Sequence, residues 1–293
     1  MANRNIIKEM VMKYGGKKLV YDFNSLKREM KLRGYSKRTQ DIYLHYNEKF
    51  LLFCKKKPLE VTNNDIKDYI EYLIDKNLAR ATIRLAFNSL RFYYGVILGK
   101  SLMVNMKAPK KSQKITQILT KEEISRLISV IKNPKHRLLV ELCYASGVRV
   151  SELVKFKVKD ILFEEKIAIV RGGKGRKDRK VILSQRFLDD FQYELMNKNQ
   201  EDYLFSGRVG YLTTRSVQAI LKTSAKKANI KKNVHPHMLR HSFATHLVND
   251  KVGIKYIQKI LGHKNIKTTE RYLHVSDEDI KSVTSPHDKL EVL

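Results

Sequence analysis

Apolar side chains recur every three or four residues in four stretches of the first hundred residues: 22–33, 36–54, 62–75 and 80–98. This period places them along one face of an α-helix. In the second stretch the apolar face consists of Ile42, Tyr46, Phe50 and Phe53, and no strand-like alternation interrupts the region. The pattern predicts a small helical bundle whose outer faces are basic and include Lys37, Arg38, Arg84 and Arg91.

A different arrangement begins after a polar stretch at 105–117, which contains a proline, a run of charges and few bulky apolar residues. Thr120 and Glu123 form a capping-box pattern at the start of a helix, and a second helical pattern at 135–145 ends before Gly147. Two apolar runs, 167–170 and 181–183, then flank the glycine-rich basic segment 171–180, which predicts a β-hairpin with a long charged turn. Helical patterns resume at 185–196, 213–228, 238–249, 254–261 and 277–283.

These patterns predict a mainly α fold with a small β-sheet, divided into two domains. We place a helical domain at 1–108, with an N-terminal extension at 1–21, a linker at 109–118 and a second domain at 119–293. For the extension we infer no function beyond that of a basic arm.

The net charge of the chain indicates a polyanionic binding partner. The chain has 59 Lys and Arg against 30 Asp and Glu, a formal charge of +29. The excess is shared, because residues 1–110 hold 23 basic and 10 acidic side chains and residues 111–293 hold 36 and 20. Both domains are therefore expected to face the same polyanionic partner. For any single basic residue, an ordinary solvated surface is the alternative.

Other compositional features exclude several classes of protein. The longest apolar run, 50–54, is far shorter than the roughly 20 residues that cross a bilayer. The first 18 residues lack the apolar core of a secretory signal, so we expect a cytoplasmic protein without membrane contact. Cys54 and Cys143 both lie in apolar helical patterns, which predicts two buried, reduced thiols and neither a disulfide nor a cysteine-based zinc site.

Four segments of the second domain concentrate basic and titratable residues beside glycines. They read GVRVSEL at 147–153, GGKGRKDR at 172–179, HMLRHSFATH at 237–246, and LGH at 261–263 followed by TTERYLH at 268–274. In this order the segments resemble the motifs of the tyrosine site-specific recombinases, in particular those of the Xer type. The resemblance covers the whole second domain and, through helix pattern alone, the first.

The resemblance implies a role for each matching residue. Tyr272 is the expected nucleophile, and a tyrosine hydroxyl can retain the phosphate covalently when a DNA strand is cut. Arg149 and Arg240 are expected to hold the phosphate, since planar guanidinium groups match its oxygens. The set is completed by Lys174 as general acid, His237 for proton exchange with Tyr272, His263 as a phosphate ligand, and Glu152 as the residue that orients Arg149. In the hairpin turn Arg176, Lys177 and Arg179 are expected to contact DNA.

A metal site is the main chemical alternative. His235, His237, His241 and His246 have spacings that can bind zinc, but residues 233–248 contain no Asp, Glu or Cys to complete such a site. We therefore expect no metal. No nucleotide cofactor is expected either, because strand exchange conserves phosphodiester bonds and no Walker-type phosphate-binding motif is present.

As a whole, the resemblance implies a two-domain clamp around double-stranded DNA, with four protomers on two recombination sites and exchange of the C-terminal tail 276–293 between neighbours. Strand exchange would pass through 3′-phosphotyrosines and a Holliday junction. The sequence RGGKG at 171–175 and the compact length are most similar to those of Xer recombinases that act alone. This similarity implies resolution of chromosome dimers at a dif-like site. An integrase of a phage or mobile element, and a noncatalytic DNA-binding protein of the same fold, are the alternatives.

Overall fold

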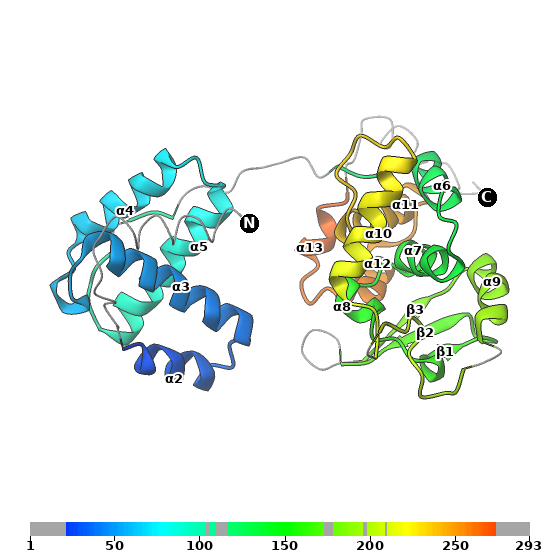
Figure 1. Ribbon diagram of the computed structural model, residues 1–293, viewed down its shortest axis with the longest axis horizontal. Coiled ribbons are helices and arrows are strands. Elements are labelled where there is room, and N and C mark those ends of the chain that lie inside the picture. Colours follow the sequence, from blue (N-terminus) through cyan, green and yellow to red (C-terminus); the bar gives the residue numbers. More distant parts are fainter. Residues whose placement is uncertain are drawn as a thin grey trace, which may run out of the picture. The chain divides into compact units, whose positions relative to one another are not determined.

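The computed structural model describes residues 22–103, 106–108, 117–172, 178–195, 198–208 and 210–273. The chain divides into two compact units, Met1–Lys114 and Ile115–Leu293 (Figure 1). The division falls within the predicted linker at 109–118, most of which lies outside the described residues. The extension 1–21 and the tail 276–293, including the predicted helix 277–283, also lie outside them.

The first unit is built from helices, as the apolar period predicts. Its elements are α2 (Asn24–Leu32), α3 (Lys37–Cys54), the short 3-10 helix η1 (Pro58–Glu60), α4 (Asn63–Asp75), α5 (Arg80–Arg91) and the π-helical turn η2 (Phe92–Ile97). Ser36 caps α3 by accepting a hydrogen bond from the Thr39 amide, and Thr62 and Asp65 form a capping box at α4. The stretch predicted as one helix at 80–98 therefore changes from α to π geometry at residue 92.

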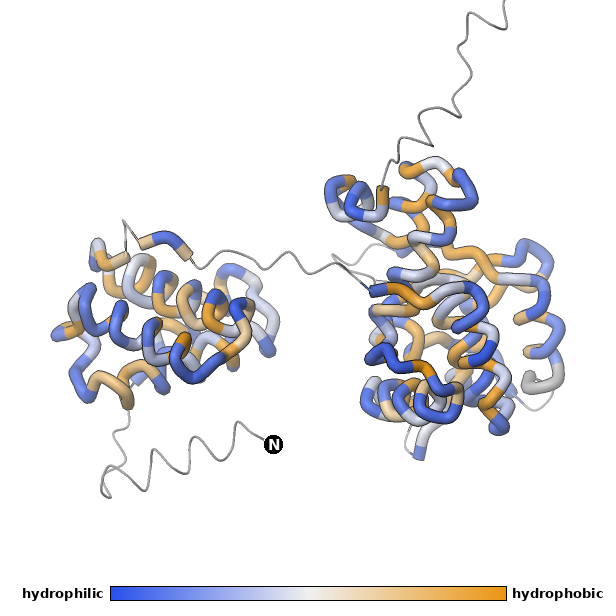
Figure 2. The backbone as a smooth tube through the Cα atoms, turned by 90° about the horizontal axis from the view of Figure 1, so that it is seen from above, coloured by the Kyte–Doolittle hydropathy of each residue, from blue (hydrophilic) through white to orange (hydrophobic). Residues whose placement is uncertain are grey.

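Aromatic rings dominate the core of this unit. Phe50, Tyr69, Phe87 and Tyr94 are fully buried, and Phe50 contacts both tyrosine rings at centroid distances of 5.3 and 5.9 Å. Along the helices of both units, short hydrophobic stretches are interspersed with hydrophilic ones (Figure 2). Cys54 is half-buried rather than buried because it is the last residue of α3, whereas Cys143 is fully buried, and both thiols are free.

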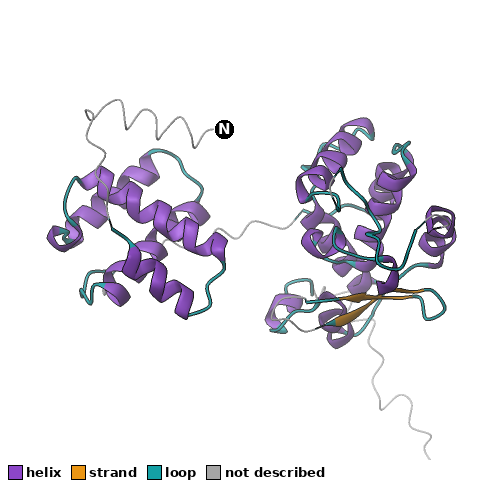
Figure 3. Ribbon diagram, turned by 60° about the horizontal axis from the view of Figure 1, so that its bottom comes forward, coloured by secondary structure: helices purple, strands orange, loops and turns teal. Residues whose placement is uncertain are grey.

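The second unit combines helices with a small antiparallel sheet (Figure 3). The chain passes through α6 (Lys121–Ser129), α7 (Pro134–Ser146), α8 (Val150–Leu153) and η3 (Val158–Asp160) before it enters the sheet. The strands are β1 (Ile161–Leu162), β2 (Ile167–Val170) and β3 (Arg179–Ile182), in spatial order β1-β2-β3. The remaining helices are α9 (Gln185–Leu195), α10 (Thr214–Lys227), α11 (Pro236–Asn249), α12 (Ile254–Leu261) and α13 (Lys267–Glu270).

The predicted capping box of α6 is present, with the Thr120 amide donating to Glu123 Oε2 at 2.8 Å. In the hairpin, Val170 pairs with Arg179, so β3 begins two residues earlier than the apolar run suggests. The two-residue strand β1 was not predicted. The mainly α fold with a small sheet, predicted from the sequence, is confirmed.

Candidate active site

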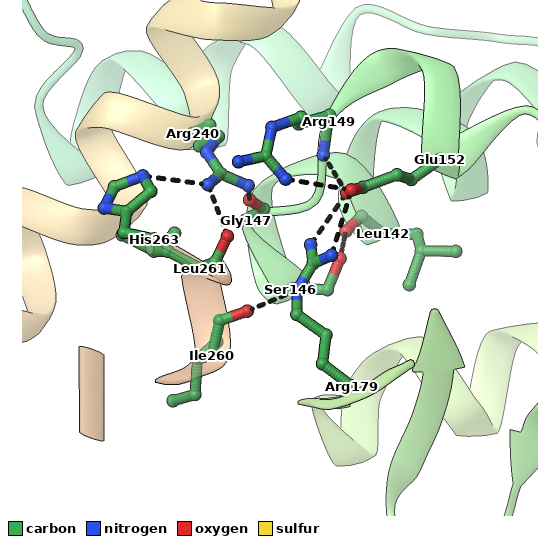
Figure 4. A network of polar contacts seen from close by, with 10 residues as sticks. All are labelled: Leu142, Ser146, Gly147, Arg149, Glu152, Arg179, Arg240, Ile260, Leu261 and His263. Carbon is green, nitrogen blue, oxygen red and sulfur yellow. Dashed lines mark hydrogen bonds and ion pairs between the residues drawn. The ribbon is translucent and has the colours of Figure 1, made fainter. Parts of the chain in front are cut away.

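A buried arginine joins the ends of two helices in the second unit. Arg240 lies on α11 with only 3% of its surface exposed. Its Nη1 donates to the Gly147 carbonyl oxygen at 2.7 Å, and its Nη2 donates to the Leu261 carbonyl oxygen at 2.6 Å (Figure 4). These carbonyls end α7 and α12, where a helix leaves its last acceptors without internal partners. A cation also suits the negative ends of the two helix dipoles.

Gly147 is required for this arrangement. Its φ of +58° is left-handed, and a Cβ atom added there would lie 2.2 Å from Phe243 Cδ1. The glycine therefore ends α7 and lets the chain pass close to α11, which brings its carbonyl to Arg240.

Beside Arg240, one carboxylate organises two more arginines (Figure 4). Glu152 Oε1 accepts from Arg149 Nη1 and from Arg179 Nη1, both at 2.9 Å. Glu152 Oε2 accepts from Arg179 Nη2 at 2.7 Å and from the Arg149 amide at 2.9 Å. Burial by itself raises the pKa of Glu152, but the hydrogen bonds and charges of Arg179 and Arg149 outweigh it and lower that pKa to about 2. Glu152 is therefore ionised at neutral pH and fixes the Arg149 side chain.

Arg179 differs from its predicted role as a DNA contact in an exposed turn. Its side chain is only 10% exposed. Both terminal nitrogens contact Glu152, and its Nε donates to the Ile260 carbonyl oxygen at 2.9 Å. Gly262 permits this approach, because a Cβ atom there would lie 2.8 Å from Arg179 Cδ. Arg179 belongs to β3 rather than to the turn, and it connects the sheet to α12 and to Glu152.

His263 follows Gly262 and lies within 3.1 Å of Arg240, measured from Nε2 to Nη2. An arginine can only donate, so Nε2 is the acceptor and Nδ1 carries the proton, which it donates to Thr269 Oγ1 at 2.9 Å. Burial and then the charge of Arg240 lower the pKa of His263 to about 4. His263 is therefore neutral at physiological pH and has both ring nitrogens occupied.

Tyr272 lies next to this group and is 6% exposed. Its ring is nearly parallel to that of His263, with centroids 6.5 Å apart, and it packs in an apolar cluster with Phe243, Ile257 and Leu261. The Tyr272 hydroxyl lies 2.7 Å from Nδ1 of His241. Burial raises the pKa of Tyr272, while Arg271 and Arg240 act in the opposite direction.

His241, rather than the predicted His237, is thus the histidine bonded to Tyr272. His237 is exposed, one turn earlier on α11, and its ring stacks on that of His241 with centroids 6.0 Å apart. The sequence prediction considered His241 only as a metal ligand. Its position four residues after His237 was the available signal, because this spacing places both rings on one side of a helix.

The histidines that suggested a metal site have other partners. His235 caps α11 by accepting from the Met238 amide through Nδ1 at 3.2 Å, and Nδ1 of His246 lies 2.8 Å from the Tyr144 hydroxyl. Within the described ranges, no group of three His, Cys, Asp or Glu residues could hold a metal ion.

A half-open pocket of about 800 Å³ borders Arg149 and Glu152. Its lining includes Ser151, Lys155 and Arg171, together with Tyr203 and Tyr211. Such a surface can bind phosphate groups through its cations and the serine hydroxyl.

Comparison with known proteins identifies this combination of fold and residues. A model of the phage integrase family matches residues 117–279. The chain belongs to this family, the tyrosine recombinases. A second model, the N-terminal SAM-like domain of phage integrases, matches residues 23–103.

Among relatives of this recombinase, tyrosine recombinase XerA of Pyrococcus furiosus is 35% identical over 271 residues, which cover 90% of this chain and 93% of XerA. XerC of Bacillus pumilus is 32% identical over 280 residues, covering 87% and 92%. The crystal structure of an XerA recombinase has a TM-score of 0.52 at 31% identity and covers 88% of this chain and 94% of that chain. The XerH recombinase bound to a palindromic difH substrate shares the fold, with a TM-score of 0.69 at 23% identity over 85% and 80% of the two chains.

Members of the family are DNA strand-transferring enzymes, and the Xer-type resemblance predicted from the motifs is confirmed.

The remaining predicted site residues either lie outside the described residues or belong to the first unit. Lys174, Arg176 and Lys177 lie outside the described residues. In the first unit Lys37, Arg38 and Arg91 are exposed, and Lys37 pairs with Asp41 at 3.2 Å, whereas Arg84 is half-buried. No helix within the described residues is long and apolar enough to cross a membrane.

Proposed function

We propose that this recombinase cuts and rejoins DNA at specific sites through a covalent 3′-phosphate ester of Tyr272. The observation that supports this most directly is a contact network that ends at Tyr272. Glu152 binds Arg149 and Arg179, and Arg179 donates to the Ile260 carbonyl oxygen on α12. The next carbonyl of α12 accepts from Arg240, which also contacts His263, and the His263 ring stacks on that of Tyr272. With Arg179 included, the network joins residues from all four sequence motifs and reaches Tyr272. A noncatalytic DNA-binding protein would not need a buried arginine and a buried tyrosine in this arrangement.

In the proposed reaction, Arg149 and Arg240 hold the scissile phosphate, and His263 contacts it when the phosphate replaces His263 Nε2 as a partner of Arg240. The guanidinium donors neutralise the charge that develops on the non-bridging oxygens. The Tyr272 oxygen attacks phosphorus, and the bond to the 5′ oxygen breaks. Lys174 protonates the leaving oxygen. His237, which was expected from the resemblance to exchange a proton with Tyr272, is exposed beside the site and contacts the phosphate instead. The step needs no metal ion and no nucleotide cofactor.

The assembly follows from the same proposal. Both domains, 1–108 and 119–293, contact the duplex mainly through phosphates and enclose it as a clamp, with Lys37, Arg38, Arg84 and Arg91 on the first domain and Arg176 and Lys177 in the hairpin turn. Four protomers assemble on two sites in the cytoplasm, exchange the tail 276–293 with their neighbours, and pass through a Holliday junction.

Chromosome dimer resolution at a dif-like site is the biological role we propose, supported by XerA and XerC relatives that match about nine-tenths of the chain. Integration of a phage or mobile element is the alternative. A deletion strain that accumulates unresolved chromosome dimers would support the chromosomal role, whereas unchanged segregation would favour the alternative.

The enzymatic proposal is tested with duplexes selected from a random pool for tight binding and then nicked at successive positions. A nick close to the cleaved phosphate lets a short fragment diffuse away, which traps the covalent protein–DNA adduct on a denaturing gel. The wild type is expected to form the adduct in EDTA, and Tyr272→Phe is expected to bind DNA without forming it. An adduct in the Phe variant, or cleavage abolished by EDTA, would contradict the proposal.

A further inference from the structure

The shortest polar contact of Tyr272 is with His241, a residue to which the resemblance assigns no catalytic role. The Tyr272 hydroxyl and His241 Nδ1 are 2.7 Å apart, and the two rings lie 5.5 Å apart between centroids. His241 is half-buried on α11, one residue after Arg240. The side chain that follows the phosphate-facing arginine therefore reaches the attacking oxygen.

The direction of this hydrogen bond follows from the charges around it. Burial, and then Arg271, His237, Arg240 and His235, lower the pKa of His241 to about 4. These groups, together with Tyr272 and His263, are the titratable and charged residues described around the imidazole; they come from α11, from the residue pair after α12 and from the segment after α13. His241 is therefore neutral at pH 7, and the phenol, whose pKa is raised, keeps its proton. The Tyr272 hydroxyl donates, Nδ1 accepts, and Nε2 of His241 carries the imidazole proton.

The other histidines are placed less well to receive this proton. His263 stacks on the Tyr272 ring, but its Nε2 accepts from Arg240 and its Nδ1 donates to Thr269. His237 is exposed and contacts the His241 ring by stacking. Among the described residues, the unshared electron pair that points at the phenolic proton belongs to His241 Nδ1.

We propose that His241 is the proton acceptor for Tyr272 in strand cleavage, an inference that rests on the proposed function. As the phenolic oxygen forms its bond to phosphorus, the proton moves from that oxygen to His241 Nδ1. The bond from phosphorus to the 5′ oxygen breaks at the same time, and the departing oxygen takes its proton from Lys174. In ligation the attacking 5′ hydroxyl gives its proton to Lys174, and the His241 imidazolium returns its proton to the Tyr272 oxygen, so no proton is consumed over a complete strand exchange.

The electrostatics require this transfer to be concerted with attack. In the free protein the phenol is much less acidic than the His241 imidazolium, so proton transfer ahead of attack is unfavourable. Once its oxygen bonds to phosphorus, the phenol becomes strongly acidic. The bound phosphate also brings negative charge to Arg271 and Arg240, two of the groups that lower the pKa of His241.

The test uses His241→Asn in the full-length chain. An asparagine amide oxygen lies close to the position of Nδ1, so it retains the hydrogen-bond acceptor but cannot take up the proton. His246→Asn is the matched control, because His246 lies on the same helix and its Nδ1 makes the equivalent contact, 2.8 Å from a tyrosine hydroxyl, with Tyr144. Single-turnover adduct formation on the nicked duplex is measured from pH 6 to pH 9, alongside DNA affinity and the circular dichroism spectrum.

We expect His241→Asn to cleave about 100-fold more slowly at pH 7, the loss typical of a missing general base. The ratio of the variant rate to the wild-type rate is expected to rise toward high pH, because hydroxide then replaces the missing base. DNA affinity is expected to be unchanged, and His246→Asn is expected to cleave within about twofold of the wild type. If His241→Asn does not fold, the same pH series is run with His241→Gln, which retains the volume but displaces the acceptor.

A His241 variant that cleaves at the wild-type rate, or whose loss is the same at every pH, would overturn the inference. An equal loss in the His246 control would also overturn it. Failure of the proposed function is distinguishable, because in that case the wild-type protein forms no adduct at Tyr272.

Discussion

Replacing Glu152 with glutamine should destabilise the second unit in a pH-dependent manner. The carboxylate is 9% exposed and is bonded to both Arg149 and Arg179. Folding lowers its pKa from 4.5 to about 2. At about 1.4 kcal/mol per pKa unit, the charged form contributes about 3 kcal/mol to the free energy of unfolding. Glutamine removes this contribution and leaves the guanidinium groups of Arg149 and Arg179, which are 24% and 10% exposed, without their counter-charge.

The pH dependence follows from the direction of the shift. A depressed carboxyl pKa stabilises the fold fully above 4.5, and this stabilisation is lost as the pH falls toward 2. We therefore expect Glu152→Gln to lose about 3 kcal/mol at pH 7 but only about 1.5 kcal/mol at pH 3, relative to the wild type at the same pH. The two proteins should converge as the solution becomes more acidic.

Urea unfolding measures this difference by circular dichroism, since the chain contains no tryptophan for fluorescence. Labelling of Cys143 with a pyridyl disulfide reports on the second unit alone, because this thiol is fully buried on α7. Glu201→Gln is the matched control. The pKa of Glu201 is also lowered to about 2, but its side chain is 65% exposed, so solvent screens its bonds to Lys157 and Lys159 and no measurable change is expected. Equal stability of Glu152→Gln and wild type at pH 7, or a loss that is constant with pH, would refute the reasoning.

Three further changes have defined outcomes. Gly147→Ala should lower the unfolding free energy by more than about 2 kcal/mol, since it combines a left-handed φ with a clash, whereas Gly172→Ala has a similar φ in open space and should cost less. Lys155→Ala, in the pocket beside Arg149, should weaken DNA binding for all sequences and reduce the slope of log affinity against log salt by about 1. Arg179→Lys retains the charge but loses the paired contact with Glu152, so cleavage should fall while DNA affinity is unchanged.

Local signals in the sequence predicted much of the fold. Ile42, Tyr46 and Phe50 have the helical spacing of α3, and the capping box of Thr120 and Glu123 starts α6. Gly147 ends α7, as predicted. These features depend on residues within a few positions of one another, and such interactions can be read directly from the order of residues.

The contacts that organise the site could not be predicted in this way. Arg179 was assigned to the turn because apolar residues begin only at Val181, yet pairing with Val170 extends β3 back to it. Because side chains alternate along a strand, only the register shows that Arg179 turns toward Glu152. The contact between His241 and Tyr272 joins residues 31 positions apart, and it depends on the path of the chain through Gly262 and α13.

The identity of the esterified residue tests the central claim most directly. Wild-type protein is trapped on the nicked duplex, digested with protease and nuclease, and sequenced by mass spectrometry. We predict a nucleotide attached through its 3′ phosphate to the Tyr272 oxygen, in the peptide that also contains Leu273. A nucleotide on any other side chain, or cleaved DNA without a covalently modified peptide, would contradict the account.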